Sequence, residues 1–104
     1  PLARHAVKPG TFHSFWMVSV ITDAAEDRDP LREHLKAVGV ETRPLFYPVH
    51  TMSMYGGGDP AAFPVADHLS RRGLNLPSYP DLTEDDVSRI CGHIRAYFSR
   101  NGRP

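Results

Sequence analysis

Apolar residues fill both alternating sets of positions along residues 13–22, HSFWMVSVIT. In an extended chain, one set consists of Phe15, Met17 and Ile21, and the other of Trp16, Val18 and Val20. A strand with two apolar faces is usually covered on both sides, as in the middle of a sheet. The segment therefore predicts a central strand, with Trp16 in the core or buried against another domain.

The first helix is predicted over residues 30–38. Asp29 offers an N-cap, and a proline follows it at the first helical position, which proline favours. The apolar face of this helix consists of Leu31, Leu35 and Val38. Gly39 ends the helix, as glycine commonly does just after the last turn.

A second helix is predicted from Pro64 to about Arg72. Its inner face carries Val65 and Leu69, and Gly73 ends it. The preceding segment, YGGGDPAAF, is predicted to be a flexible loop, and the following one, LNLPSYP, a brief strand closed by proline.

The C-terminal helix begins at Thr83 and Asp86, which form a pair like a capping box. One apolar stripe runs along it, made of Val87, Ile90, Cys91, Ile94 and Phe98. The order of elements predicts an α+β fold, a two-layer sandwich with about three helices packed on one face of a short sheet. The other face then needs cover, and the two-sided apolarity of the first strand points to a partner domain.

Length and charge narrow the classes of function. A chain of 104 residues is a single domain on length alone. The formal net charge is zero, which argues against nucleic acid or an anionic membrane as the main partner. No apolar run approaches the roughly 20 residues that span a bilayer. No basic segment followed by an apolar run opens the sequence, so secretion is not expected. With Cys91 as its only cysteine, the chain is expected in the cytoplasm.

Histidine spacing argues against a metal site. The six histidines, at positions 5, 13, 34, 50, 68 and 93, form no His-x-His or His-x-x-x-His pair, the spacings that commonly ligate zinc. The loop YGGGDP has no following Lys-Ser/Thr pair, so a phosphate-binding loop is not expected there either.

Residues 40–55, VETRPLFYPVHTMSMY, concentrate ring-bearing and polar side chains along one connector. This connector overlaps the block G-V-E-T-R-P-x-F-Y-P-x-H, and a second block reads F-P-V-A-x-x-L-S-R-R-G-L-N-L-P. Together the two blocks resemble the C-terminal segment of the DegT/DnrJ/EryC1/StrS family of pyridoxal-phosphate-dependent sugar aminotransferases. Within that family they look most like perosamine synthase-type enzymes, and the resemblance extends over residues 13–99.

The resemblance implies the small C-terminal domain of the fold-type I aminotransferases. Residues 13–104 would form this domain, and residues 1–12 the connector from a missing upstream large domain. In the family, the large domain carries the lysine that binds pyridoxal 5'-phosphate. Lys8 and Lys36, the only lysines here, lie in no such motif. We therefore expect the cofactor in the full-length parent, and neither catalytic residues, bound cofactor nor activity in this fragment.

The same resemblance implies amino transfer from an amino acid such as glutamate to a keto sugar on a nucleotide, in the biosynthesis of polysaccharides or sugars. The expected partners are the chain's own large domain, a second subunit of a homodimer, and nucleotide-sugar and amino-donor substrates. Two alternatives stay open: a related pyridoxal-phosphate-dependent sugar dehydratase, and a non-catalytic α+β ligand-binding or regulatory domain. A nucleic-acid module is disfavoured, because paired aromatic residues and a basic excess are lacking.

Three residues of the connector are candidates for substrate binding. Arg43 precedes a proline, which keeps it extended, and its guanidinium can hold a carboxylate or phosphate by two hydrogen bonds. Tyr47 and His50 can hydrogen-bond sugar hydroxyls, and histidine can also move a proton near neutral pH. Each has a structural alternative: an ion pair of Arg43 with Glu41, a loop role for His50 and packing for Tyr47.

Overall fold

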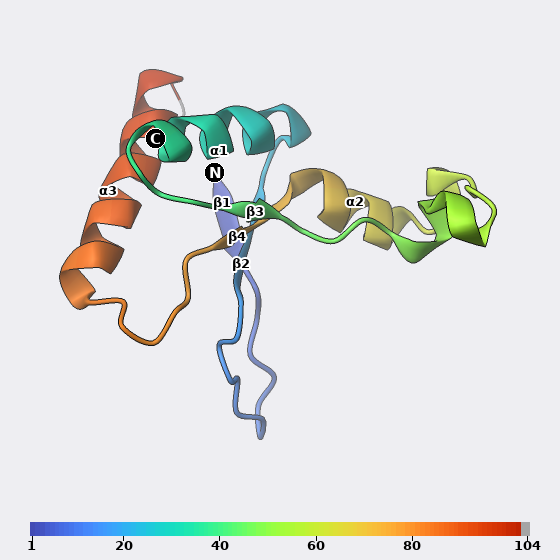
Figure 1. Cartoon of the computed structure of the whole chain (residues 1–104), viewed down its shortest axis with the longest axis horizontal. Coiled ribbons are helices and arrows are strands. Elements are labelled where there is room, and N and C mark those ends of the chain that lie inside the picture. The colour runs from blue at the N-terminus through green and yellow to red at the C-terminus, as the bar shows by residue number, and fades with distance from the viewer. Residues whose placement is uncertain (103–104) are drawn as a thin grey trace.

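The structure is a computed structural model that describes residues 1–102. A four-stranded antiparallel sheet in the order β1-β2-β4-β3 lies at its centre (Figure 1). The strands are β1 (Leu2–Arg4), β2 (Val18–Thr22), β3 (Arg43–Pro44) and β4 (Gly73–Leu76). The helices are α1 (Arg28–Ala37), α2 (Pro64–Arg72) and α3 (Glu84–Arg100), with 3-10 turns η1 (Ala25–Asp27), η2 (Val49–Thr51), η3 (Ser53–Tyr55) and η4 (Pro60–Ala62).

Strand β2 is central, as the apolar pattern predicted, but it is shorter than expected. It pairs with β1 on one side and with β4 on the other, and residues 13–17 lie outside it. Trp16 is therefore not in the core, and 74% of its surface is exposed. The prediction of a core position for Trp16 was wrong, whereas its burial against another domain stays a prediction.

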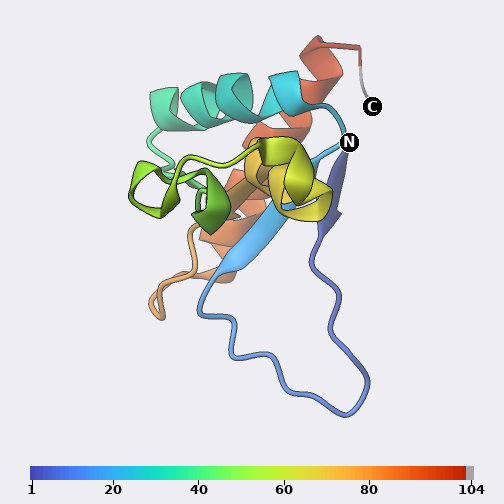
Figure 2. The ribbon, with the colours of Figure 1, turned by 90° about the vertical axis from the view of Figure 1, so that its right-hand side faces the viewer.

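Strand β1 was not predicted, since three residues are too few for an alternating pattern to stand out. Leu2 pairs with Thr22, and Arg4 pairs with Val20. A long hairpin loop joins β1 to β2 and projects away from the sheet (Figure 2). The chain thus enters the sheet within the first twelve residues, which were expected to be a connector.

The core lies between one face of the sheet and helices α1 and α3. It consists of Val20, Leu31, Leu35, Val40, Leu74, Ile90, Ile94 and Phe98. The apolar faces predicted for the first and last helices supply most of these residues, with Val38 packed at the margin. Cys91 is half-buried, and Val87, at the start of the predicted stripe, is exposed. The α+β fold class is confirmed.

The predicted C-terminal end of α1 is correct, whereas the predicted N-terminal end is not. Gly39 follows the helix with φ +80°, the left-handed conformation in which glycine commonly ends a helix. The prediction that Gly39 ends this helix is confirmed. The helix begins at Arg28 rather than Pro30, and Asp29 lies in its first turn instead of capping it. There Asp29 accepts a hydrogen bond of 2.9 Å from Nε of Arg28, and this bond holds the pKa of Asp29 below its usual value.

The capping box at the start of α3 is confirmed. Oγ1 of Thr83 accepts a hydrogen bond of 3.1 Å from the backbone N–H of Asp86, and the backbone N–H of Thr83 donates one of 3.1 Å to Oδ2 of Asp86. The hydrogen bonds from Thr83 lower the pKa of the Asp86 carboxyl below its model-peptide value of 3.8. Since the pKa is depressed on folding, the carboxylate's contribution to stability is fully present above pH 3.8 and is lost as the pH falls through the folded value.

Replacing Thr83 by alanine is expected to lower the free energy of unfolding by about 1 kcal/mol, because the first turn of α3 loses its side-chain acceptor. Urea denaturation followed by circular dichroism would measure the change. Ser88 is exposed on the same helix, and alanine there should cost nothing. Equal losses at the two positions would show that the capping box contributes nothing.

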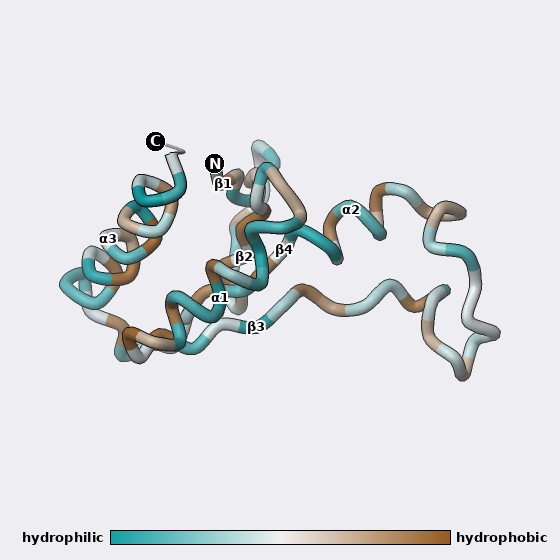
Figure 3. The backbone as a smooth tube through the Cα atoms, turned by 90° about the horizontal axis from the view of Figure 1, so that it is seen from above, coloured by the Kyte–Doolittle hydropathy of each residue, from teal (hydrophilic) through white to brown (hydrophobic). Residues whose placement is uncertain are grey.

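Helix α2 stands apart from the other two helices. It extends away from the sheet on the side opposite α3 (Figures 1 and 3). Val65 on this helix is 72% exposed, and Leu69 is also exposed. The inner face predicted for α2 was therefore wrong, because neither Val65 nor Leu69 is buried among the described residues.

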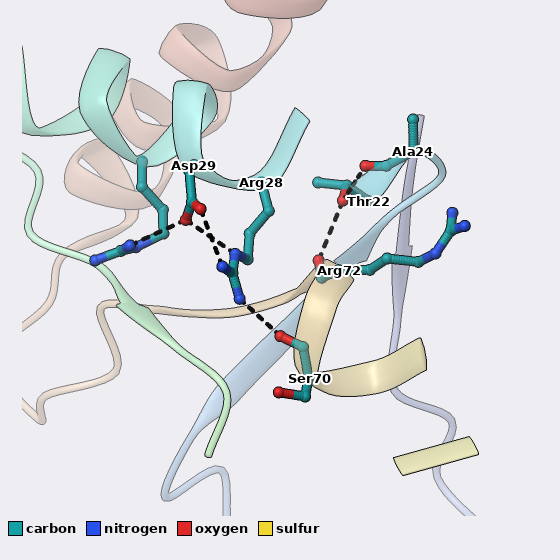
Figure 4. A network of polar contacts seen from close by, with 7 residues as sticks. Thr22, Ala24, Arg28, Asp29, Ser70 and Arg72 are labelled. Atoms are coloured by element: carbon teal, nitrogen blue, oxygen red, sulfur yellow. Dashed lines mark hydrogen bonds and ion pairs between the residues drawn. The ribbon is translucent and has the colours of Figure 1, made fainter. Parts of the chain in front are cut away.

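Polar contacts hold the C-terminal end of α2 in place (Figure 4). Nη1 of Arg28 donates to the carbonyl oxygen of Ser70 at 2.7 Å, and Oγ1 of Thr22 donates to that of Arg72 at 3.2 Å. The guanidinium of Arg72 donates to the carbonyl oxygen of Asp23. These contacts hold the C-terminal end of α2 against α1, β2 and the residue after β2, and the helix extends outward from there (Figure 1).

The overall shape is more extended than the length of the chain predicts. The radius of gyration is 15.2 Å, whereas a compact chain of this length has about 13 Å. The hairpin loop and the projecting helix account for the excess, as Figures 1 and 2 show. Within residues 1–102, no helix combines the length and apolar character needed to cross a membrane.

Candidate functional site

The edge strand β3 presents Arg43. In the register of the sheet, Arg43 lies opposite Asn75, and Asn75 lies opposite Ser19. Partners in register share a face, so these three residues lie on the face turned away from the core residues Val20 and Leu74. The extended conformation predicted for Arg43 is confirmed.

The guanidinium of Arg43 is only loosely held. Its Nη2 lies 3.6 Å from Oε1 of Glu41, and the two side chains are 81% and 85% exposed. The structural alternative for Arg43 is therefore present as an ion pair, but one so exposed stabilises the fold very little. The guanidinium stays free to exchange this partner for another anion.

His50 lies on turn η2, within the segment 45–63 that leads from β3 to α2, which we call the arm. Its ring packs 4.6 Å from that of Phe63. Its Nε2 is buried and has no hydrogen-bond partner within residues 1–102. A buried polar atom without a partner is costly, so a partner from outside this chain would stabilise the arm.

Tyr47 is exposed on the arm. The structure does not gather the three predicted residues around one cavity: Arg43 lines a cavity that Tyr47 and His50 do not. Tyr47 and His50 lie further along the arm, where Phe46, Val49, Met54 and Tyr55 are also exposed. Among the described residues, the candidates are thus divided between β3, which carries Arg43, and the arm, which carries Tyr47 and His50, and they do not form one closed site.

A cavity of about 600 Å³ opens beside Arg43. It lies where β4 ends, β3 begins and the first half of α3 passes. Its walls are formed by Met17, Gly39, Val40, Glu41, Thr42, Arg43, Pro44, Phe46, Asn75, Leu76, Pro77, Ser78, Tyr79, Arg89 and Ile90. Sequence reasoning did not select Arg89 or Tyr79, because each lies far from Arg43 in the chain and stands in no motif.

The described residues do not fit pyridoxal phosphate. Lys8 is exposed in the hairpin loop, and Lys36 is exposed on α1. Lys36 lines a separate cavity with Arg32, Glu33 and residues 39–42, and no aromatic ring lies there to stack on a pyridine. Nor do three or more potential metal-ligating side chains gather anywhere within residues 1–102.

Comparison with known proteins identifies the family. The profile of the DegT/DnrJ/EryC1/StrS aminotransferase family matches residues 2–95. The chain belongs to this family. GDP-perosamine synthase of Escherichia coli O157:H7 is 46% identical over 95 residues, which cover 91% of this chain and 26% of that protein. GDP-perosamine synthase of Vibrio cholerae is 43% identical over 102 residues, which cover 95% of this chain and 28% of that protein.

Solved structures of DegT/DnrJ/EryC1/StrS proteins and related aminotransferases share the fold. Aminotransferase TlmJ from Streptoalloteichus hindustanus superposes with a TM-score of 0.85 at 28% identity, over 97% of this chain and 27% of that one. DesV from S. venezuelae, solved with a ketimine intermediate, has a TM-score of 0.83 at 29% identity, and the match covers 92% of this chain and 26% of that one. The chain therefore spans about a quarter of the length of its relatives.

Proposed function

We propose that this chain is the small domain of a pyridoxal-phosphate-dependent nucleotide-sugar aminotransferase that acts in the cytoplasm as a homodimer. The family match over residues 2–95 carries the proposal, and the identity to two GDP-perosamine synthases supports a nucleotide-sugar substrate. Residues 13–104 form the body of this domain. Residues 1–12 lead in from the large domain and contribute β1 to the sheet.

The cofactor belongs to the part of the enzyme outside this chain, where it would supply the electron sink for amino transfer. Within the chain, the work is binding and orientation. Arg43 holds an anionic group of a substrate, while Tyr47 and His50 supply hydrogen bonds from the arm. The buried, unpartnered Nε2 of His50 and the excess radius of gyration support an arm that rests against another part of the enzyme.

The full-length enzyme tests the proposal. It should transfer an amino group from glutamate to a nucleotide-linked keto sugar, and the isolated chain should not. Arg43→Ala should raise the KM for the nucleotide sugar or the amino donor about tenfold or more, because a charge-assisted hydrogen bond is lost. Steady-state kinetics with each substrate varied in turn would measure this.

Glu41→Ala is the matched control, since it removes the ion-pair partner of Arg43 and leaves the guanidinium in place. This variant should keep both KM values within about twofold. Unchanged KM values in Arg43→Ala would remove Arg43 from the site. An enzyme that removes a sugar hydroxyl instead of transferring an amino group would overturn the aminotransferase assignment.

A further inference from the structure

The hairpin loop between β1 and β2, residues 5–17, contains a strained backbone position (Figure 2). Phe15 has φ +53°, and it is the only residue other than glycine with a positive φ among residues 1–102. A residue with a large side chain is strained in this left-handed conformation, because its Cβ atom comes too close to the following carbonyl oxygen. Such a conformation persists only where neighbouring contacts enforce it. The contacts of Phe15 therefore identify what holds the loop in shape.

A histidine side chain supplies the polar contact of Phe15. The backbone N–H of Phe15 donates a hydrogen bond of 2.8 Å to Nδ1 of His13. Asparagine and aspartate side chains commonly accept from the N–H two residues further on, in an Asx turn, and the imidazole of His13 takes that place here. The bond requires a lone pair on Nδ1, so His13 is neutral in this arrangement. A proton on Nδ1 would turn the acceptor into a donor and break the bond.

The rings of His5, His13 and Phe15 form a stack at the base of the loop. The ring of His13 lies 4.3 Å from that of His5, with 15° between their planes, and 4.5 Å from that of Phe15. Nδ1 of His5 lies 3.3 Å from the carbonyl oxygen of Ser19. Since a carbonyl only accepts, Nδ1 of His5 donates, and this bond survives protonation of the ring. His13 has no such protection, and two stacked imidazolium ions would also repel each other.

No carboxylate in this part of the sequence offsets the charge of a protonated histidine. Residues 2–22 contain neither aspartate nor glutamate, whereas Arg4 and Lys8 are both cations. The titratable residues that line one cavity with Phe15 are Arg4 from β1, Tyr79 from the segment after β4 and Cys91 from α3, and none of them is an anion at neutral pH with its ordinary pKa. No opposite charge would therefore hold the two imidazole rings together once both are protonated.

Phe15 also forms part of the wall of an apolar cavity. This cavity, of about 460 Å³, opens between the sheet and the first half of α3. Its wall consists of Arg4, Phe15, Val18, Leu76, Pro77, Ser78, Tyr79, Leu82, Val87, Ile90 and Cys91. Val18 and Leu76 are partners in the register of the sheet, and Ile90 belongs to the core. Movement of Phe15 away from this wall would expose apolar surface that adjoins the core.

We propose that His13 is an acid-sensitive latch of the hairpin loop. Its neutral imidazole holds Phe15 in the left-handed conformation at the wall of the apolar cavity, and uptake of a proton at Nδ1 releases Phe15 and uncovers the cavity. Histidine is the side chain that ordinarily changes its charge between about pH 5 and pH 8. The loop is therefore closed above this range and opens as the pH falls through it.

The fluorescence of Trp16 reports the state of the loop in the 104-residue chain. Trp16 is the only tryptophan. It follows Phe15 directly, and its carbonyl oxygen accepts a hydrogen bond of 2.9 Å from the hydroxyl of Ser78. Its fluorescence should change in one transition between about pH 8 and pH 5. Over the same range, the fluorescence of the apolar dye ANS should rise about twofold or more as the cavity opens, while far-UV circular dichroism stays constant because the helices and the sheet do not take part.

Two replacements of His13 should fix the loop in opposite states. In His13→Asn, the side-chain Oδ1 takes the place of Nδ1 and accepts the same bond without titrating, so both fluorescence signals should keep their alkaline values at every pH. In His13→Ala, no acceptor is left, and both signals should keep their acidic values. His68 is exposed on α2, outside the loop, so His68→Asn is the matched control and should titrate like the unaltered chain.

Three results would overturn the proposal. The first is a Trp16 fluorescence that stays constant over this range of pH, and the second is a His13→Asn variant that titrates like the unaltered chain. The third is a circular dichroism signal that changes together with the fluorescence, which would assign the transition to unfolding of the whole chain. None of these measurements involves a cofactor, a nucleotide sugar or amino transfer, so the latch and the proposed function can each fail without the other.

Discussion

Replacing Gly73 by alanine is expected to destabilise the chain by about 3 kcal/mol. Gly73 joins α2 to β4 and is buried. A Cβ atom there would lie 2.6 Å from the backbone carbonyl oxygen of Leu69 and would clash with the side chain of Leu45. The Leu45 side chain can turn away, but the carbonyl oxygen belongs to the last turn of α2, so the helix itself would have to shift.

The physical reason for a glycine at this position is close packing and not backbone conformation. Gly73 has φ −87°, which any residue adopts, so the left-handed role that ends α1 at Gly39 does not apply here. A shift of α2 would also move the arm, which carries Tyr47 and His50. In the full-length enzyme, Gly73→Ala should therefore reduce activity as well as stability.

Gly92→Ala is the matched control for this prediction. Gly92 lies inside α3, and a Cβ atom there would meet no atom within 4 Å. Alanine is a better helix former than glycine by up to about 1 kcal/mol, so this variant should be at least as stable as the unaltered chain. Urea denaturation of both variants would decide, and the packing argument fails if Gly73→Ala unfolds at the same urea concentration as Gly92→Ala.

Leu35→Ala should cost about 2–5 kcal/mol of unfolding free energy. Leu35 on α1 has no exposed surface and lies in the core with residues of β2, β4 and α3. Its loss would leave a cavity between the two layers, where neither the sheet nor α3 can readily close. Small domains are only marginally stable, so a loss of this size would populate the unfolded chain at physiological temperature.

Leu69→Ala is the same chemical change at an exposed site of α2, where Leu69 is 37% exposed. It should cost less than about 1 kcal/mol in this chain, because little apolar surface returns to water. Thermal or urea unfolding of the two variants would separate them. If both lose equal stability, the core does not lie between α1 and the sheet as described.

Local signals predicted the elements whose cause is local. The capping pair at Thr83 and Asp86 and the glycine at 39 depend on a few neighbouring residues, and both predictions are confirmed. The apolar stripes of the first and last helices likewise correspond to the core, because helical spacing puts residues on one face whatever their partner is. The family resemblance of the connector and of the block that contains α2 and β4 is confirmed by the family match.

Predictions that needed a distant partner were less successful. Val65 and Leu69 share an apolar face, yet the direction in which α2 leaves the sheet exposes both of them. Trp16 continues an apolar run, yet β2 begins two residues later. The strand at residues 2–4 forms by pairing with β2. A pattern of only three residues is too short to predict such pairing.

The amino-acid sequence alone determined the C-terminal end of α1, the start of α3, the apolar faces of these two helices, the central position of β2 and the family, since these follow from spacing along the chain and from two sequence blocks. Only the tertiary structure decided that Gly73 is required by close approach, that α2 and the arm project from the sheet, and that Arg89 faces the same cavity as Arg43. The reason is that antiparallel pairing and helix packing bring together residues far apart in the chain. Such contacts depend on three-dimensional direction, which the period of a sequence does not encode.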